Sequence, residues 1–161
     1  MRLRRYRTED LPILARLFGE TVRQVNCRDY TLPQVEAWAA GEADLLTRDS
    51  WFQRLYTLVA EAGGRIVGYG NVEDTGYLDH LFVRWDCQGQ GIGTALLEAV
   101  LDLADNWLML RRVELEVYAD NGGAIRLYQR LGFETEGCKR EAAVKAGAYV
   151  DTLVMARLRN R

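Results

Sequence analysis

The stretch QGQGIGTALL, residues 88–97, decides the fold, because it sets three glycines at alternate positions and then continues into helix-forming residues. It follows a strand pattern and precedes a helical one, so unpaired backbone N–H groups and the positive end of a helix dipole converge there. With no side chains at Gly89, Gly91 and Gly93, an anion can approach these amides closely. The stretch predicts either a phosphate-binding turn or a strand-to-helix turn that uses glycine only for its geometry.

Two familiar phosphate-binding motifs do not fit this stretch. The nucleoside-triphosphate loop needs a lysine after its last glycine, whereas Thr94 follows Gly93 directly. The dinucleotide fingerprint needs a glycine at position 94 inside a parallel βαβ unit, whereas the strands expected before this turn are antiparallel. Neither motif therefore accounts for the three glycines.

The rest of the chain predicts alternating strands and helices. Thr8 with Asp10 offers a helix cap, Gly41 a helix end and Gly63-Gly64 a hairpin turn. The expected strands are 3–7 at a sheet edge, two on either side of the hairpin turn, 76–83, 112–118 and a closing strand at 149–158. The expected helices are 11–25, 31–41 with a continuation at 51–55, one after the glycines, and 121–132. We expect one mixed α/β domain over residues 1–161.

The composition and net charge of the chain argue against several classes of binding partner. The formal net charge is −2, which gives no general electrostatic reason to bind nucleic acid or an anionic membrane. Cys27, Cys87 and Cys138 fit neither a disulfide framework nor a zinc pattern, and a single histidine, His80, argues against a histidine-rich metal site. No signal peptide or apolar membrane-spanning run is evident. We expect a soluble, cytoplasmic protein without a metal, whose partner is a small molecule.

Two separated motifs together resemble the GNAT (GCN5-related N-acetyltransferase) family. LFVRWDCQGQGIGTALLEAV is similar to the family's acyl-CoA signature through Gln88, Gly91 and Gly93. DNGGAIRLYQRLGFETEG is similar to the segment that follows in the family, with matches at Asn121, Ala124, Tyr128, Gly132 and Phe133. The resemblance implies the GNAT acyl-CoA N-acyltransferase fold, which is a mixed α/β fold. Its central, mostly antiparallel sheet has about six or seven strands, is flanked by about four helices, and has strands 4 and 5 splayed apart.

The resemblance also implies acetyl-CoA as cosubstrate and a role for several residues. The pantetheine arm would pair with the free backbone of Leu81, Phe82 and Val83. Asn121 matches a position that contacts the cofactor, although it can equally cap the following helix. Tyr128 matches the general acid that protonates the departing CoA sulfur; its alternative is ordinary packing. The pyrophosphate would rest on the amides of Gln88, Gly89, Gln90, Gly91, Ile92, Gly93 and Thr94.

The general base is less defined. YLDHLFV resembles a strand that carries a carboxylate base in polyamine-type members, which matches Asp79; a solvated strand face is the alternative. His80 has a suitable ordinary pKa, but strict alternation points it away from Asp79 unless a bulge intervenes. Glu73 and Glu116 are further candidates. Cys87 has no neighbouring base or motif that would make it a nucleophile, so direct transfer is favoured.

The acceptor follows from the resemblance of the C-terminal half to bacterial amino-acid N-acetyltransferases, whereas the N-terminal half resembles another group of small bacterial GNAT proteins. We expect transfer to a primary amine of a small molecule, foremost an amino acid. The alternatives are peptide or protein amines, or a non-catalytic acyl-CoA-binding module. Similar enzymes are often dimers, so a homodimer is a further expectation. Tyr30, Trp38, Trp51 and Phe52 would line an acceptor pocket or pack in the core.

Overall fold

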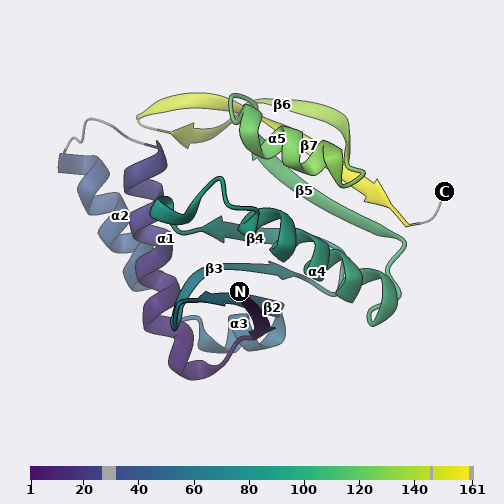
Figure 1. Cartoon of the computed structure of the whole chain (residues 1–161). Coiled ribbons are helices and arrows are strands. Elements are labelled where there is room, and N and C mark those ends of the chain that lie inside the picture. The colour runs from purple at the N-terminus through teal and green to yellow at the C-terminus, as the bar shows by residue number, and fades with distance from the viewer. Residues whose placement is uncertain (27–31, 146, 160–161) are drawn as a thin grey trace.

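The structure, a computed structural model, describes residues 1–26, 32–145 and 147–159 (Figure 1). The strands are β1 (Arg2–Arg5), β2 (Tyr56–Ala62), β3 (Arg65–Val72), β4 (Leu78–Val83), β5 (Arg112–Tyr118), β6 (Glu134–Lys145) and β7 (Ala148–Leu158). The helices are α1 (Leu11–Asn26), α2 (Leu32–Leu45), α3 (Asp49–Arg54), α4 (Ile92–Asn106) and α5 (Gly122–Arg130), with short 3-10 helices at Thr8–Asp10 and Trp85–Cys87. The predicted alternation of strands and helices is confirmed, and the described residues form five α-helices rather than about four.

The strands form two antiparallel sheets (Figure 1). The first has the order β1-β2-β3-β4, so β1 is the edge strand that its sequence predicts, and the second has the order β5-β7-β6. Within the described residues, the two sheets are bridged at Tyr77 and Glu114 alone, where the chain runs parallel. Strands β4 and β5 are therefore splayed, as expected.

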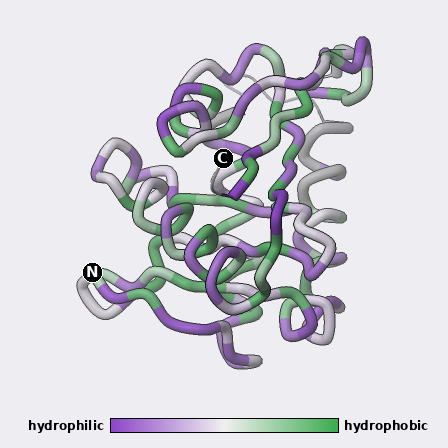
Figure 2. Tube along the Cα trace, turned by 90° about the vertical axis from the view of Figure 1, so that its right-hand side faces the viewer, coloured by the Kyte–Doolittle hydropathy of each residue, from purple (hydrophilic) through white to green (hydrophobic). Residues whose placement is uncertain are grey.

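The first sheet is covered on both faces. On one face α4 packs its predicted apolar stripe, including Leu97, Val100 and Leu101, against the strands. On the other face, Leu14 of α1 and Phe52 of α3 pack against Tyr69 of β3. Figure 2 shows hydrophobic stretches running through the middle of the molecule, whereas turns and outer tips are mostly hydrophilic. None of the described helices has the length and apolar character that crossing a membrane requires.

Two sequence predictions about elements are wrong. Helix α2 continues through Gly41 to Leu45, and a Cβ at Gly41 would lie 3.4 Å from the Phe18 ring, so this glycine lets α1 and α2 approach closely rather than ending the helix. Strand β7 does not close the second sheet, because β6 pairs with its outer edge. Residues 134–142 of β6 are all exposed. The strand therefore lacks the alternation of apolar and polar residues by which a strand is predicted from sequence.

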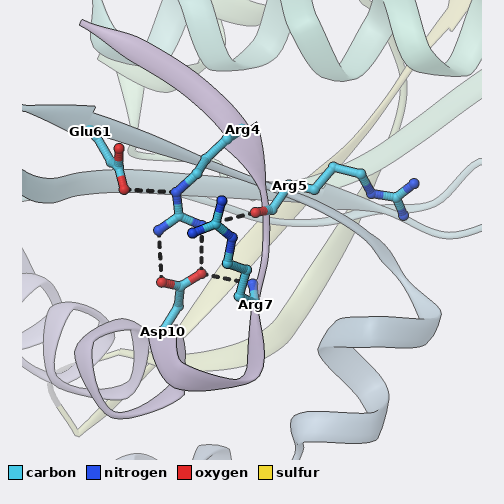
Figure 3. A network of polar contacts seen from close by, with 5 residues as sticks. All are labelled: Arg4, Arg5, Arg7, Asp10 and Glu61. Carbon is cyan, nitrogen blue, oxygen red and sulfur yellow. Dashed lines mark hydrogen bonds and ion pairs between the residues drawn. The ribbon is translucent and has the colours of Figure 1, made fainter.

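A partly buried ion-pair network connects the first strand to the start of α1 (Figure 3). The Arg4 guanidinium donates two hydrogen bonds of 2.8 Å to the Asp10 carboxylate and one of 2.7 Å to Glu61 of β2. Asp10 also accepts the Arg7 amide at 2.7 Å. Asp10 thus reaches back from the 3-10 turn rather than capping α1 directly, and the turn continues into α1 at Leu11.

Candidate active site

The gap between β4 and β5 begins just after their bridge. There the Glu114 amide donates to the Gly76 carbonyl at 2.9 Å, and from that point the two strands diverge (Figure 1). In the described part of the chain, β4 pairs only with β3, through Leu81 with Gly70, Phe82 with Tyr69 and Val83 with Gly68. Every strand carries main-chain polar groups toward both of its edges. The Arg84 amide donates to the Val67 carbonyl at 2.7 Å, so in this ladder the main-chain groups of Phe82 face Tyr69, whereas those of Leu81 and Val83 face the gap.

The glycine loop lies at the C-terminal end of β4 and opens α4. Gly89 and Gly91 have positive φ values of 74° and 81°, a conformation that favours glycine, and Gly91 is the N-cap residue of α4. No side chain caps this helix, so its first amides have no side-chain acceptor. A Cβ added at Gly89 or Gly91 would meet nothing within 4 Å, so neither side chains nor main chain crowd this side of the loop. A positive helix end with bare amides attracts an anion.

Gly93 joins this loop to α5. A Cβ at this position would lie 3.5 Å from the Val83 side chain and 3.6 Å from Leu127, so the loop, β4 and α5 meet there. Gln88 is exposed, and its side-chain amide donates to the Val83 carbonyl at 3.4 Å. The structure thus brings together the predicted strand segment, the predicted anion loop and, through Leu127, the predicted helix of Tyr128.

Helix α5 holds two of the predicted site residues. Asn121 caps it by accepting the Ala124 amide at 3.2 Å, which confirms the capping role. Tyr128 is buried edge-on against Phe133, in the cluster that also receives Leu81. Burial raises the pKa of Tyr128 to about 12, and its hydroxyl has no hydrogen-bond partner among the described residues. The phenol is therefore protonated at neutral pH, which is the form a general acid requires.

Asp79 and His80 lie side by side on β4 but differ in environment. Asp79 is exposed, and its pKa is raised, first by desolvation and then by the charge of Glu73, with Arg48 acting in the opposite direction. A raised pKa brings a carboxylate closer to the range of an effective base. Four carboxylates, those of Glu116, Asp79, Glu114 and Glu73, add to burial in raising the pKa of Tyr77. Acidic side chains thus gather where the strands part.

His80 is enclosed by aromatic rings. Phe18, Trp51, Tyr69 and Phe82 lie 5.1–5.8 Å from its ring, centroid to centroid. Its Nδ1 is hydrogen-bonded to the Tyr69 hydroxyl at 2.9 Å. Burial lowers the pKa of His80 to about 4, with Arg48 adding to the shift. The imidazole is therefore neutral and weakly basic at neutral pH.

Comparison with known proteins adds a second line of evidence. Residues 20–133 match the family model described as "Acetyltransferase (GNAT) family". The chain belongs to the GNAT acetyltransferase family. It is an acetyl-CoA-dependent N-acetyltransferase with the mixed α/β fold of that family, as the motifs predicted.

Three similar proteins illustrate the range of this likeness. L-amino acid N-acetyltransferase AaaT of Escherichia coli is 41% identical over 76 residues, which cover 47% of this chain and 46% of AaaT. An L-methionine sulfoximine/L-methionine sulfone acetyltransferase of Pseudomonas paraeruginosa is 28% identical over 160 residues, covering 91% of this chain and 87% of the relative. The structure of yncA from Salmonella typhimurium, solved with its cofactor acetyl-CoA, superposes with a TM-score of 0.76 at 22% identity, over 100% of this chain and 95% of yncA.

Three further residues that the sequence offered as possible bases or as a nucleophile have different surroundings. Glu73 accepts a hydrogen bond from the Thr75 hydroxyl at 3.0 Å and lies close enough to Asp79 to act on its pKa. Glu116 is engaged by Lys139 and by Thr152. Cys87 is a buried free thiol whose pKa is raised by burial and by Asp86, which disfavours the nucleophilic thiolate.

The predicted aromatic residues have different outcomes. Phe52 is completely buried in the core, whereas Trp51 is half-buried between His80 and Arg48, whose guanidinium lies 5.5 Å above the Trp51 ring. Cys27 and Tyr30 lie outside the described residues, as does the side chain of Trp38.

Sequence reasoning did not single out Asn71, Tyr69 or Arg48. Asn71 is completely buried and accepts the His80 amide at 2.9 Å. Asparagine is depleted in strands, so its place in the apolar run IVGYGNV was a signal that something specific holds it there. Tyr69 meets His80 across the β3–β4 pairing, and Arg48 acts electrostatically on Asp79 and His80, which lie far from it in the sequence. No local sequence pattern indicated either relation.

Proposed function

We propose that this acetyltransferase moves the acetyl group of acetyl-CoA directly to the α-amine of a free amino acid or a close analogue. The transfer itself is supported by one observation: β4 and β5 part beside an uncrowded glycine loop that opens α4 without a side-chain cap. For the acceptor, the support comes from the two relatives described above, whose names specify L-amino acids and two L-methionine derivatives.

The donor would occupy the gap as an added strand. Its pantetheine arm runs alongside Leu81, Phe82 and Val83 and pairs with the main chain of Leu81 and Val83. Its diphosphate accepts hydrogen bonds from the amides between Gln88 and Thr94. Asn121 uses its side-chain oxygen for capping, which leaves its Nδ2 hydrogens available to the cofactor. Gly93 is needed because a side chain there would enter the space between β4 and α5.

In the chemical step, the neutral amine nitrogen attacks the thioester carbonyl carbon, an N–C bond forms and the C–S bond breaks. Asp79 takes the proton released by the amine, directly or through a water molecule, and Tyr128 donates its proton to the departing sulfur. An α-amine with a pKa near 8 costs only about 1.4 kcal/mol to deprotonate at pH 7, against about 4.6 kcal/mol for a lysine-like amine. An exposed carboxylate with a modestly raised pKa suits the α-amine.

The direct test incubates purified protein with acetyl-CoA and a panel of amines, and follows the release of free CoA thiol and the mass of the acetylated product. The panel contains the L-amino acids, methionine sulfoximine, spermidine and short peptides. We expect thiol release that depends on the acceptor, with the highest kcat/KM for one or a few free amino acids.

Two outcomes of this experiment contradict the proposal in different ways. A higher kcat/KM for peptides or spermidine overturns the amino-acid acceptor but keeps the donor site. Binding of acetyl-CoA without turnover of any amine in the panel favours an acyl-CoA-binding module instead.

A further inference from the structure

The pairing of β3 with β4 contains one extra residue on β4. Gly70 lies opposite Leu81 and Val72 lies opposite Leu78, so a single residue of β3, Asn71, faces both Asp79 and His80. Two residues opposite one define a β-bulge, which bends the strand and changes the direction of its side chains.

The bulge decides where Asp79 points. Leu78 and Leu81 both pack in the cluster that α4 covers, although residues three apart face opposite sides in a regular strand. In a regular strand Asp79 would share a face with Leu81 and Val83, against α4 in the apolar core. The extra residue instead leaves Asp79 exposed, while His80 joins Phe82 and Tyr69 on the other face.

The Asn71 side chain provides a hydrogen-bond acceptor for a main-chain amide of the bulge. Its Oδ1 accepts the His80 amide at 2.9 Å, in place of a main-chain carbonyl of β3. The side chain is completely buried, and its Nδ2 has no hydrogen-bond partner in the part of the chain that the structure describes. An apolar residue of similar size would avoid this cost of burial but would leave the His80 amide without an acceptor.

We propose that Asn71 is a positioning residue, which holds the β4 bulge through the His80 amide and thereby aims Asp79 into the gap between β4 and β5. This inference rests on the proposed function, in which Asp79 is the base. The charged groups that act on the pKa of Asp79 are Glu73 in the β3–β4 turn and Arg48 before α3, and Asp79 in turn raises the pKa of Tyr69 and Tyr77. A base displaced by about 1 Å from its reaction geometry loses about 10²-fold in rate.

The test compares Asn71→Leu with Thr57→Val. Thr57 is the cross-strand neighbour of Asn71 on β2, is equally buried, and donates to the Phe52 carbonyl at 3.0 Å. We expect Asn71→Leu to lower kcat by about 10²-fold and to shift the pH profile of kcat/KM, with the Kd for CoA unchanged. Thr57→Val removes a buried hydrogen bond of similar kind, and should lower Tm while keeping the pH profile of the native protein.

A double variant shows whether Asn71 acts through Asp79. In an Asp79→Asn background, Asn71→Leu should cause no further loss of kcat, because the group it positions is already gone. Additive losses, or a folded Asn71→Leu protein with native kcat and pH profile, overturn the inference. If Asp79→Asn alone has native activity, the proposed base is wrong, which is a separate failure.

A measurement on the native protein covers the case in which Asn71→Leu does not fold. Amide hydrogen exchange followed by NMR should show His80 protected, since its N–H donates to a buried oxygen. Exchange of the His80 amide as fast as that of exposed loop amides contradicts the bond on which the inference depends.

Discussion

At the scale of single residues, Tyr128 carries the clearest prediction. Its phenol is buried, protonated and without a hydrogen-bond partner among the described residues. Tyr128→Phe removes the proposed proton donor and little packing, so we expect kcat to fall by about 10²-fold with the Kd for CoA and Tm nearly unchanged. Steady-state kinetics and calorimetry measure these quantities. Tyr56→Phe on β2 is the control, and native kcat in Tyr128→Phe would refute the assignment.

The raised pKa of Asp79 predicts how kcat/KM changes with pH. Because its pKa is raised, the ionised form that accepts the proton is lost at a higher pH than for an ordinary carboxylate, and kcat/KM rises as pH increases through that raised value. Asp79→Asn should lower kcat by about 10²-fold and abolish this acidic limb, without lowering Tm. Asp74→Asn, an exposed acid in the preceding turn, serves as the control. The acceptor amine gives a separate limb near its own pKa. A second limb at lower pH that survives unchanged in Asp79→Asn would exclude Asp79 as the base.

The residues of the candidate site were predictable to different degrees. Short sequence motifs singled out the loop and Tyr128 as candidates, and the resemblance of its strand singled out Asp79. The different environments of Asp79 and His80 could not be foreseen in detail, since they depend on a bulge that only the pairing with β3 reveals. Asn71 was missed for the same reason.

At the scale of elements, the two glycines around the start of α4 serve different purposes: one allows a positive φ angle and the other leaves space for the ligand. Gly91 has a φ of 81°, so Gly91→Ala should cost about 1–2 kcal/mol of stability. Gly93 lies inside α4, where alanine is the better helix former and a Cβ would make ordinary contacts at 3.5 and 3.6 Å. Gly93→Ala should therefore leave Tm unchanged or higher, yet weaken CoA binding by crowding the gap.

Thermal unfolding and calorimetric titration of both variants test this contrast. Gly123→Ala is the control, because a Cβ there would meet nothing within 4 Å. It shows the effect of replacing glycine by alanine in a helix without crowding a neighbour. Unaltered CoA affinity in Gly93→Ala would mean that the ligand does not pass between β4 and α5.

Elements were predictable from sequence where one face is buried. β3, β4 and α4 have strong apolar patterns because each packs against the core, and their predicted positions are confirmed. β6 was not recognised because residues 134–142 are exposed, so pairing with β7 rather than burial defines that strand. The end of α2 was misjudged because Gly41 serves helix packing, which a local rule for helix ends does not include.

At the scale of the whole molecule, the Arg4–Asp10 pair links stability to pH (Figure 3). Burial alone would raise the pKa of Asp10, but hydrogen bonds from Arg4 and Arg7 outweigh it and the pKa is lowered. The stabilisation is therefore fully present above the unfolded-state pKa of about 3.9 and is lost as pH falls through the lower folded-state value.

Asp10→Asn should reduce the free energy of unfolding by about 3 kcal/mol at pH 7, with a smaller difference from the native protein below pH 3. Urea unfolding at several pH values measures this difference. Glu9→Gln, an exposed neighbour, should change little. A difference that stays constant down to pH 2 would show that Asp10 has the same pKa in the folded and unfolded states, and would contradict the lowered folded-state value.

The account as a whole depends on acetyl-CoA entering the gap where the two sheets separate. The most direct measurement is a crystal structure of the protein with CoA bound. We predict the diphosphate within hydrogen-bonding distance of the amides of residues 89–94, and the pantetheine arm alongside Leu81, Phe82 and Val83. A CoA molecule whose diphosphate lies elsewhere, with the glycine loop untouched, would contradict the account.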